Sequence, residues 1–97
     1  MKSSSYRKRY ILVYSDNLQS RIKHIDSDLY RVFRARRKYI RGNYAIFRTN
    51  QYYRDQFIEY VKNEMPGVET ITTSGSMKKC KEAIAARKDT QIIGANL

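Results

Sequence analysis

The chain has 97 residues, enough for one small domain with its own hydrophobic core and too few for a second lobe. Its net charge of +11 comes from 20 lysines and arginines against 9 aspartates and glutamates. Such an excess opposes compaction unless a polyanion neutralises it, so we expect a nucleic acid as partner rather than an anionic membrane surface. One cysteine, Cys80, excludes an internal disulfide, and with one histidine, His24, it leaves no ligand set for a zinc site.

The beginning of the chain is expected to be a flexible basic arm at residues 1–6, followed by Arg7-Lys8-Arg9. The apolar run Tyr10–Tyr14 is too short for the core of a signal peptide or for a membrane span. We therefore expect a cytoplasmic protein that does not contact a membrane. Because the run is continuously apolar, it predicts a strand that is buried on both faces at the middle of a sheet.

A helix is predicted after that strand, opened by Asp16 and Gln19 as a variant of the capping box. Its buried face is expected to carry apolar residues that recur every three or four positions: Leu18, Ile22, Ile25, Leu29 and Val32 or Phe33. His24 lies off this face, so we expect it on the surface and not as a catalytic base.

Five basic residues follow within eight positions, from Arg34 to Arg41. A solvated basic face is one interpretation, but solubility alone explains this density poorly. Residues 38–40 predict a short edge strand, where charges discourage unwanted pairing. Gly42-Asn43 then predicts a hairpin turn into Tyr44–Thr49, a second strand of central character.

The second half of the chain predicts a helix, a strand and a further helix. Thr49 or Asn50 is expected to cap the first of these helices, and Pro66-Gly67 to end it. Its apolar face is expected to carry Tyr53, Phe57, Ile58, Val61 and Met65. A strand is predicted at 68–73 and a helix near 75–88, with Met77, Cys80 or Lys81, Ile84 and, as a further candidate, Ala85 inward and Cys80 as a packed thiol. Residues 89–97 are expected to be a tail, in which Ile92-Ile93 could pair as a short strand or contact a partner.

The turn between that strand and the last helix combines several features of an anion site. Ser74 or Ser76 can cap the helix, and a helix start presents free N–H groups at the positive end of the dipole. Lys78, Lys79 and Lys81 follow at once, although lysines in a first turn oppose the dipole. An ordinary cap followed by solvated lysines is the alternative interpretation.

The element order is therefore β-α-β-β-α-β with a trailing helix, which predicts a ferredoxin-like α+β sandwich. In this fold the sheet is antiparallel, as in RNA-recognition modules, with the first and third strands in the middle. The apolar character of the first and third strands agrees with that order. We expect one RNA-binding domain over residues 7–88.

Binding, not catalysis, is the function that these residues favour. Ser74 and Ser76 have no histidine in reach, and Gly75 does not belong to a phosphate loop of the nucleotide-hydrolase kind. One candidate surface is the sheet, where aromatic side chains of the two middle strands would stack on unpaired bases. The other is an electrostatic surface that would grip RNA phosphates. It would comprise Arg7, Lys8, Arg9, Arg34, Arg36, Arg37, Lys38, Arg41, Ser74, Gly75, Ser76, Lys78, Lys79 and Lys81.

Three segments resemble the small protein subunit shared by ribonuclease P and ribonuclease MRP, called ribonuclease P protein component 2 in archaea. They are Arg9–Val13, Ala45–Arg48 and above all Ser74-Gly75-Ser76-Met77-Lys78-Lys79. The family typically shows Ser-Gly-Thr, an aliphatic residue and two basic residues at the last of these. The present chain is shorter than is usual in the family, chiefly between the first helix and the third strand.

The resemblance implies a protein that is not itself a nuclease and binds no cofactor. In the family, an RNA holds the active site and cuts the 5′ leader from precursor tRNA with magnesium. The small subunit pairs with a larger barrel-fold protein, component 3, often dimerises, and stabilises the catalytic domain of the RNA. The alternatives are a stand-alone RNA-recognition module that binds single strands, a structural protein of the ribosomal type, and a small enzyme, for which no site is evident.

Overall fold

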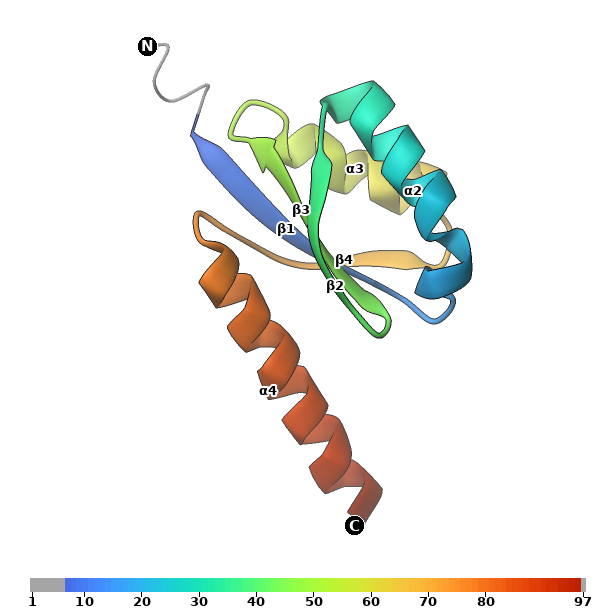
Figure 1. Ribbon diagram of the computed structural model, residues 1–97, viewed down its shortest axis with the longest axis vertical. Coiled ribbons are helices and arrows are strands. Elements are labelled where there is room, and N and C mark those ends of the chain that lie inside the picture. Colours follow the sequence, from blue (N-terminus) through green and yellow to red (C-terminus); the bar gives the residue numbers. More distant parts are fainter. Residues whose placement is uncertain (1–6, 97) are drawn as a thin grey trace.

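The computed structural model describes residues 7–96, with side chains for residues 7–87. Its elements are β1 (Lys8–Ser15), α2 (Leu18–Phe33), β2 (Arg36–Arg41), β3 (Tyr44–Asn50), α3 (Arg54–Glu64), β4 (Val68–Ser74) and α4 (Met77–Asn96). The predicted order of a ferredoxin-like fold with an additional C-terminal helix is confirmed (Figure 1). The arm expected at residues 1–6 lies outside the described residues.

The four strands form one antiparallel sheet in the order β2-β3-β1-β4. β1 and β3 occupy the middle, as their apolar runs predict, and residues 11–13 and 44–47 are buried. The hairpin between β2 and β3 turns at Gly42, whose φ of +59° favours glycine because a side chain would crowd the backbone. The sheet therefore has two central strands that need cover on both faces.

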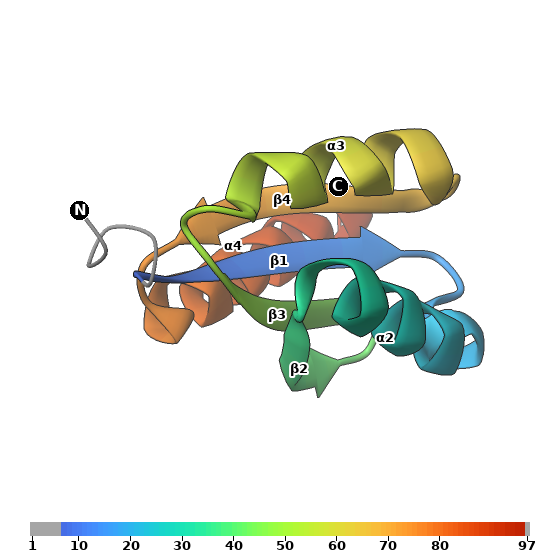
Figure 2. The same ribbon diagram turned by 90° about the horizontal axis from the view of Figure 1, so that it is seen from above.

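Helices α2 and α3 cover one face of the sheet (Figure 2). Successive side chains of a strand point to opposite faces, so Ile11 and Val13 of β1 and Phe47 of β3 belong to this layer. The predicted helix stripes supply the other half of the core. Their buried members are Leu18, Ile25, Leu29 and Phe33 of α2, with Phe57 and Val61 of α3 and Met65 just beyond it.

Helix α4 packs on the opposite face and extends beyond the sheet (Figure 1). Leu12 and Ile46, the intervening residues of β1 and β3, pack there with Cys80 and Ile84 of α4. The helix continues to Asn96, so the predicted end near residue 88 and the strand at Ile92-Ile93 are wrong. Residues 88–93 contain no proline or glycine, so nothing in this stretch stops a helix that has already begun.

Both predicted caps of the two shorter helices are wrong, because the capping side chains have other partners. Asp16 accepts a hydrogen bond from the Tyr14 hydroxyl at 2.6 Å, and α2 is preceded by Asn17 instead. Thr49 stays in β3, and Asn50 Oδ1 accepts from the backbone N–H of Tyr53 at 3.0 Å. That turn delays α3 until Arg54.

Candidate nucleic-acid interface

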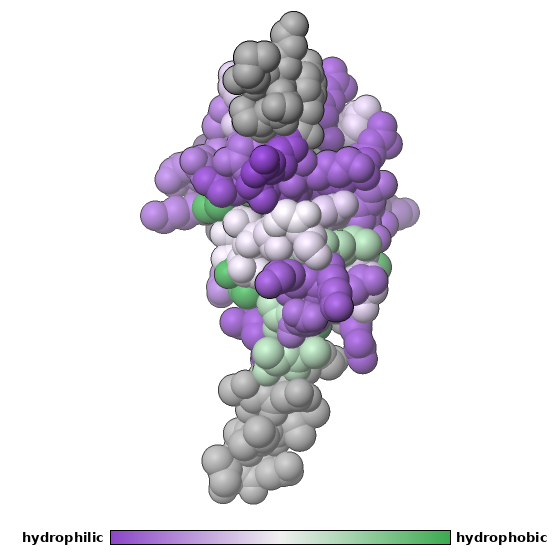
Figure 3. Space-filling model, turned by 90° about the vertical axis from the view of Figure 1, so that its left-hand side faces the viewer, coloured by the Kyte–Doolittle hydropathy of each residue, from purple (hydrophilic) through white to green (hydrophobic). Residues whose placement is uncertain are grey.

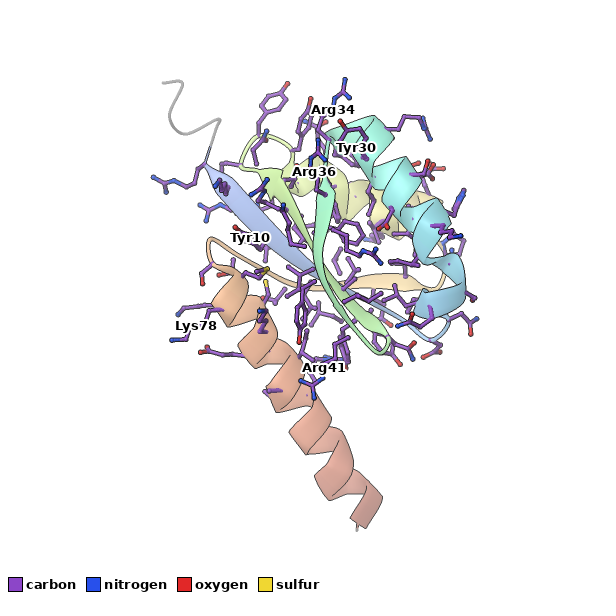
Figure 4. All side chains as sticks on the ribbon, in the orientation of Figure 1. Tyr10, Tyr30, Arg34, Arg36, Arg41 and Lys78 are labelled. Atoms are coloured by element: carbon purple, nitrogen blue, oxygen red, sulfur yellow. The ribbon has the colours of Figure 1, made fainter. Side chains whose placement is uncertain are left out.

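One end of the sheet brings together basic residues that are far apart in the sequence. The strand register places Arg36, Arg48, Tyr10 and Ser74 in one row across β2, β3, β1 and β4. Neighbouring strands lie about 4.8 Å apart, so this row spans about 14 Å. We define the basic end as the cations that lie at or beside this row: Lys8, Arg9, Arg34, Arg36, Arg48, Lys78 and Lys79. Figure 4 shows Arg34, Arg36 and Tyr10 toward this end, with Lys78 at the start of α4.

The start of β1 touches the turn that opens α4. A Cβ atom added to Gly75 would lie 2.9 Å from Nη1 of Arg9, so a side chain at position 75 would push the end of this arginine aside. Arg9 also donates from Nε to the side-chain oxygen of Gln51. Glycine at position 75 therefore lets an arginine lie against the turn, and the contact joins two of the three predicted basic segments.

The predicted anion site at the start of α4 keeps most of its features. The Ser74 hydroxyl accepts from the backbone N–H of Ser76 at 3.1 Å, so Ser74 shapes the turn and Ser76 directly precedes the helix. The first turn of α4 contains no acidic residue, and Lys78 and Lys79 are exposed. The helix dipole and the two lysines would therefore act together on an anion. Figure 3 shows the side of the molecule on which the start of α4 lies, where an area of intermediate hydropathy lies between strongly hydrophilic regions.

Four predicted residues lie away from the basic end, so the segment from Arg34 to Arg41 does not form one surface. Arg37 pairs with Asp26 of α2 at 3.4 Å, and Lys38 is exposed at an irregularity in the register of β2. Arg41 pairs with Tyr44 at the far end of the strand, and Lys81 lies 4.6 Å from the ring centroid of Tyr39. A strand of six residues spans about 20 Å, and its successive side chains point to opposite faces of the sheet. Basic residues that are consecutive in the sequence are therefore spread over both faces and both ends of β2.

Two residues that contribute to the basic end are not predicted as site residues from the sequence. Arg48 follows the apolar part of β3, and only the pairing of β2 with β3 places it opposite Arg36. Tyr30 is 38% exposed at the C-terminal end of α2. Its ring centroid lies 5.5 Å from Cζ of Arg34 and 5.0 Å from Cζ of Arg36, within the range of cation–π attraction. The tyrosine thus holds two guanidinium groups at one place.

The face that a base-stacking mode would require is covered. Cys80 and Ile84 of α4 are buried against Leu12 and Ile46, and burial raises the pKa of the Cys80 thiol. This agrees with the packed thiol that the sequence predicts. Tyr14 and Tyr44 pack against each other with ring centroids 5.0 Å apart, and they flank the same apolar cluster. Arg87 Nε donates to the Tyr44 hydroxyl at 3.3 Å, so α4 also contacts an aromatic side chain of this face.

Other kinds of site are not evident among residues 7–87. No group of three or more histidine, cysteine, aspartate or glutamate side chains that could hold a metal ion is found there. His24 is exposed, as predicted, and lies 3.6 Å from a carboxylate oxygen of Asp28. No helix in the described part of the chain is long and apolar enough to cross a membrane.

No protein-family model matches the chain, and no curated protein matches it.

Proposed function

We propose that this protein is an RNA-binding, non-catalytic subunit of ribonuclease P, the ribonucleoprotein that matures the 5′ ends of tRNA. The observation that carries the proposal is the charge at the basic end. None of its seven cations forms an ion pair with a carboxylate in the described part of the chain. Because like charges that converge without counter-charges repel each other, a polyanion would stabilise this surface.

The mode of binding in this proposal is electrostatic. Backbone phosphates would contact the basic end, and the affinity would fall steeply with salt as condensed counterions are released. Stacking of bases on the middle strands receives less support, because α4 packs on that face through Cys80 and Ile84. The protein would therefore recognise the shape of a folded RNA more than a base sequence.

The contact between Gly75 and Arg9 is a second observation that supports the proposed function. Two of the segments that resemble the ribonuclease P subunit, Arg9–Val13 and Ser74–Lys79, meet where the Arg9 guanidinium lies against Gly75. Residues distant in sequence thus form one surface at the basic end. In the proposal, this surface contacts the catalytic domain of the ribonuclease P RNA.

The remaining parts of the assembly follow from the resemblance and belong to the proposal. The partners would be the ribonuclease P RNA and the larger barrel-fold subunit, with a second copy of this chain at the centre of the assembly and precursor tRNA contacted indirectly. Magnesium would serve the active site of the RNA, not the protein. The protein would act in the cytoplasm.

Reconstitution tests the proposal. The purified chain, incubated with precursor tRNA and magnesium, should leave the substrate intact. The ribonuclease P RNA and the barrel-fold subunit should then process it more efficiently when the chain is added. Specific 5′ cleavage by the chain alone would contradict the proposal, as would a processing rate that is the same with and without the chain.

A further inference from the structure

A hollow of about 230 Å³ lies within the basic end, between three elements of the fold. Lys8 of β1, Arg34 at the C-terminal end of α2 and Arg48 of β3 line it. Phe33, Thr49 and Asn50 complete the lining, which contains no acidic residue. Three of the residues that line the hollow are thus basic, and each comes from a different part of the chain.

The polar groups around the hollow favour a bound anion over a bound cation. In the described part of the chain, none of the three basic side chains pairs with a carboxylate. Asn50 accepts through Oδ1 from the backbone N–H of Tyr53, which leaves its NH₂ group to donate. The Thr49 hydroxyl donates to the Phe33 carbonyl at 3.3 Å, so its proton is used within the fold and the donors left for an anion are the three basic side chains and Asn50.

The backbone of Arg34 provides a second, independent indication. Its φ of 56° and ψ of 25° are left-handed, and it is the only residue other than glycine with positive φ among those described. Its N–H donates to the Tyr30 carbonyl at 2.8 Å, and the N–H of Ala35 donates to the Leu29 carbonyl at 3.3 Å, so these two bonds close the end of α2. Glycine normally fills this position because it has no Cβ to strain the backbone. An arginine here indicates a role for its side chain that outweighs the strain.

We propose that this hollow binds one phosphate group, held by Lys8, Arg34 and Arg48. Guanidinium groups match the geometry of phosphate oxygens and bind them through paired hydrogen bonds. This inference rests on the proposed function, in which the phosphate belongs to the backbone of the bound RNA. The same chemistry would also accept a free phosphate or a phosphorylated small molecule, so the test has two arms.

The first arm uses inorganic phosphate and the full chain, followed by nitrogen-15 NMR. The backbone amides of Thr49 and Asn50 and Nε of Arg48 should shift in a saturable way. Arg48→Gln should weaken this binding about tenfold, the loss expected for one charge-assisted contact. Lys62→Gln, an exposed substitution on α3, is the matched control and should leave the binding unchanged.

Arg34→Gly separates binding from folding in the same arm. Glycine adopts the left-handed conformation without strain, so this variant should melt at the same temperature as the wild type or above it. It should nevertheless bind phosphate more weakly, because one guanidinium group is lost. If phosphate shifts no resonance around the hollow, or if both variants bind it like the wild type, the phosphate site is refuted.

The second arm identifies the source of the phosphate. Affinity for the ribonuclease P RNA is measured against salt for the wild type, Arg48→Gln, Lys8→Gln and the Lys62→Gln control. Each substitution at the hollow should lower the log–log slope measurably, but by no more than about 0.7–0.9, the value of one lost phosphate contact, because the other two cations remain. Unchanged slopes, with tight binding by the wild type, would refute the RNA contact and leave the proposed function standing. A wild type that binds phosphate but not this RNA would refute the proposed function and assign the hollow to a free phosphoryl ligand.

Discussion

Replacing Lys78 and Lys79 together by glutamate should separate the stability of the fold from its affinity for RNA. Both lysines are exposed in the first turn of α4, which contains no acidic residue. Each positive charge at a helix N-terminus costs about 0.3–1 kcal/mol at low salt, and a negative charge there is favourable by a similar amount. The residues that pack on the sheet, Cys80 and Ile84, are untouched.

The free protein should therefore be as stable as the wild type or more stable, by about 1 kcal/mol after allowance for solvent screening. The affinity for RNA should instead fall. Two phosphate contacts would become repulsive beside Arg9, and each lost contact with a charged group is worth about 1.5 kcal/mol, or about tenfold. The salt slope should fall by about 1.5 for the two contacts.

Thermal melting and a binding isotherm on the same preparation measure both effects. Lys62→Glu is an informative control, because Lys62 lies in the last turn of α3, where the dipole favours a cation. That variant should melt slightly earlier and bind RNA almost normally. The reasoning is refuted if the double variant melts clearly earlier than the wild type, or if it binds RNA with unchanged affinity.

Three further predictions concern the layer under α4 and the half-buried carboxylate of Asp26 on α2. Ile84→Ala should lower the free energy of unfolding by about 2–4 kcal/mol in denaturant titrations, because it opens a cavity under α4. A change in the free energy of unfolding below about 0.5 kcal/mol would mean that α4 does not pack there. Cys80 should react slowly with iodoacetamide at pH 7 in the native protein and rapidly in denaturant, because burial raises the pKa of its thiol; equal rates would contradict the packing. Burial also raises the pKa of the Asp26 carboxyl above its ordinary value, although the pair with Arg37 opposes the shift. The native state therefore binds the carboxyl proton more tightly than the unfolded state does. The stability that this tighter proton binding contributes is lost as pH rises through the native pKa. Asp26→Asn should therefore stabilise the protein more at pH 7 than at pH 3 in melting curves, and the opposite order would contradict this sign.

The sequence predicts the fold well because its hydrophobic pattern and its turns agree. The continuous apolar runs of β1 and β3 predict central strands, and a central strand needs cover on both faces. Met77, Cys80 and Ile84 of α4 supply the second cover at helical spacing. The full length of α4 is not evident from the sequence, since residues 88–93 contain no glycine or proline that would mark a sharp end.

The candidate interface was harder to predict, because it depends on the pairing of strands. The run from Arg34 to Arg41 looks continuous in the sequence, but Arg37 turns to Asp26 while Arg41 lies at the far end of β2. Arg48 stands at the end of an apolar strand, and nothing local marks it as basic surface. The left-handed conformation of Arg34 likewise has no signal in the sequence, because glycine would be expected there.

Purification of the protein from the cells that produce it, followed by sequencing of the RNA in the eluate, tests the central claim most directly. Under the proposed function, ribonuclease P RNA should be strongly enriched over total RNA. Its recovery should fall when Lys78 and Lys79 are replaced by glutamate and should not change with Lys62→Glu. An eluate that lacks this RNA, or that contains ribosomal RNA in its place, would contradict the assignment to ribonuclease P.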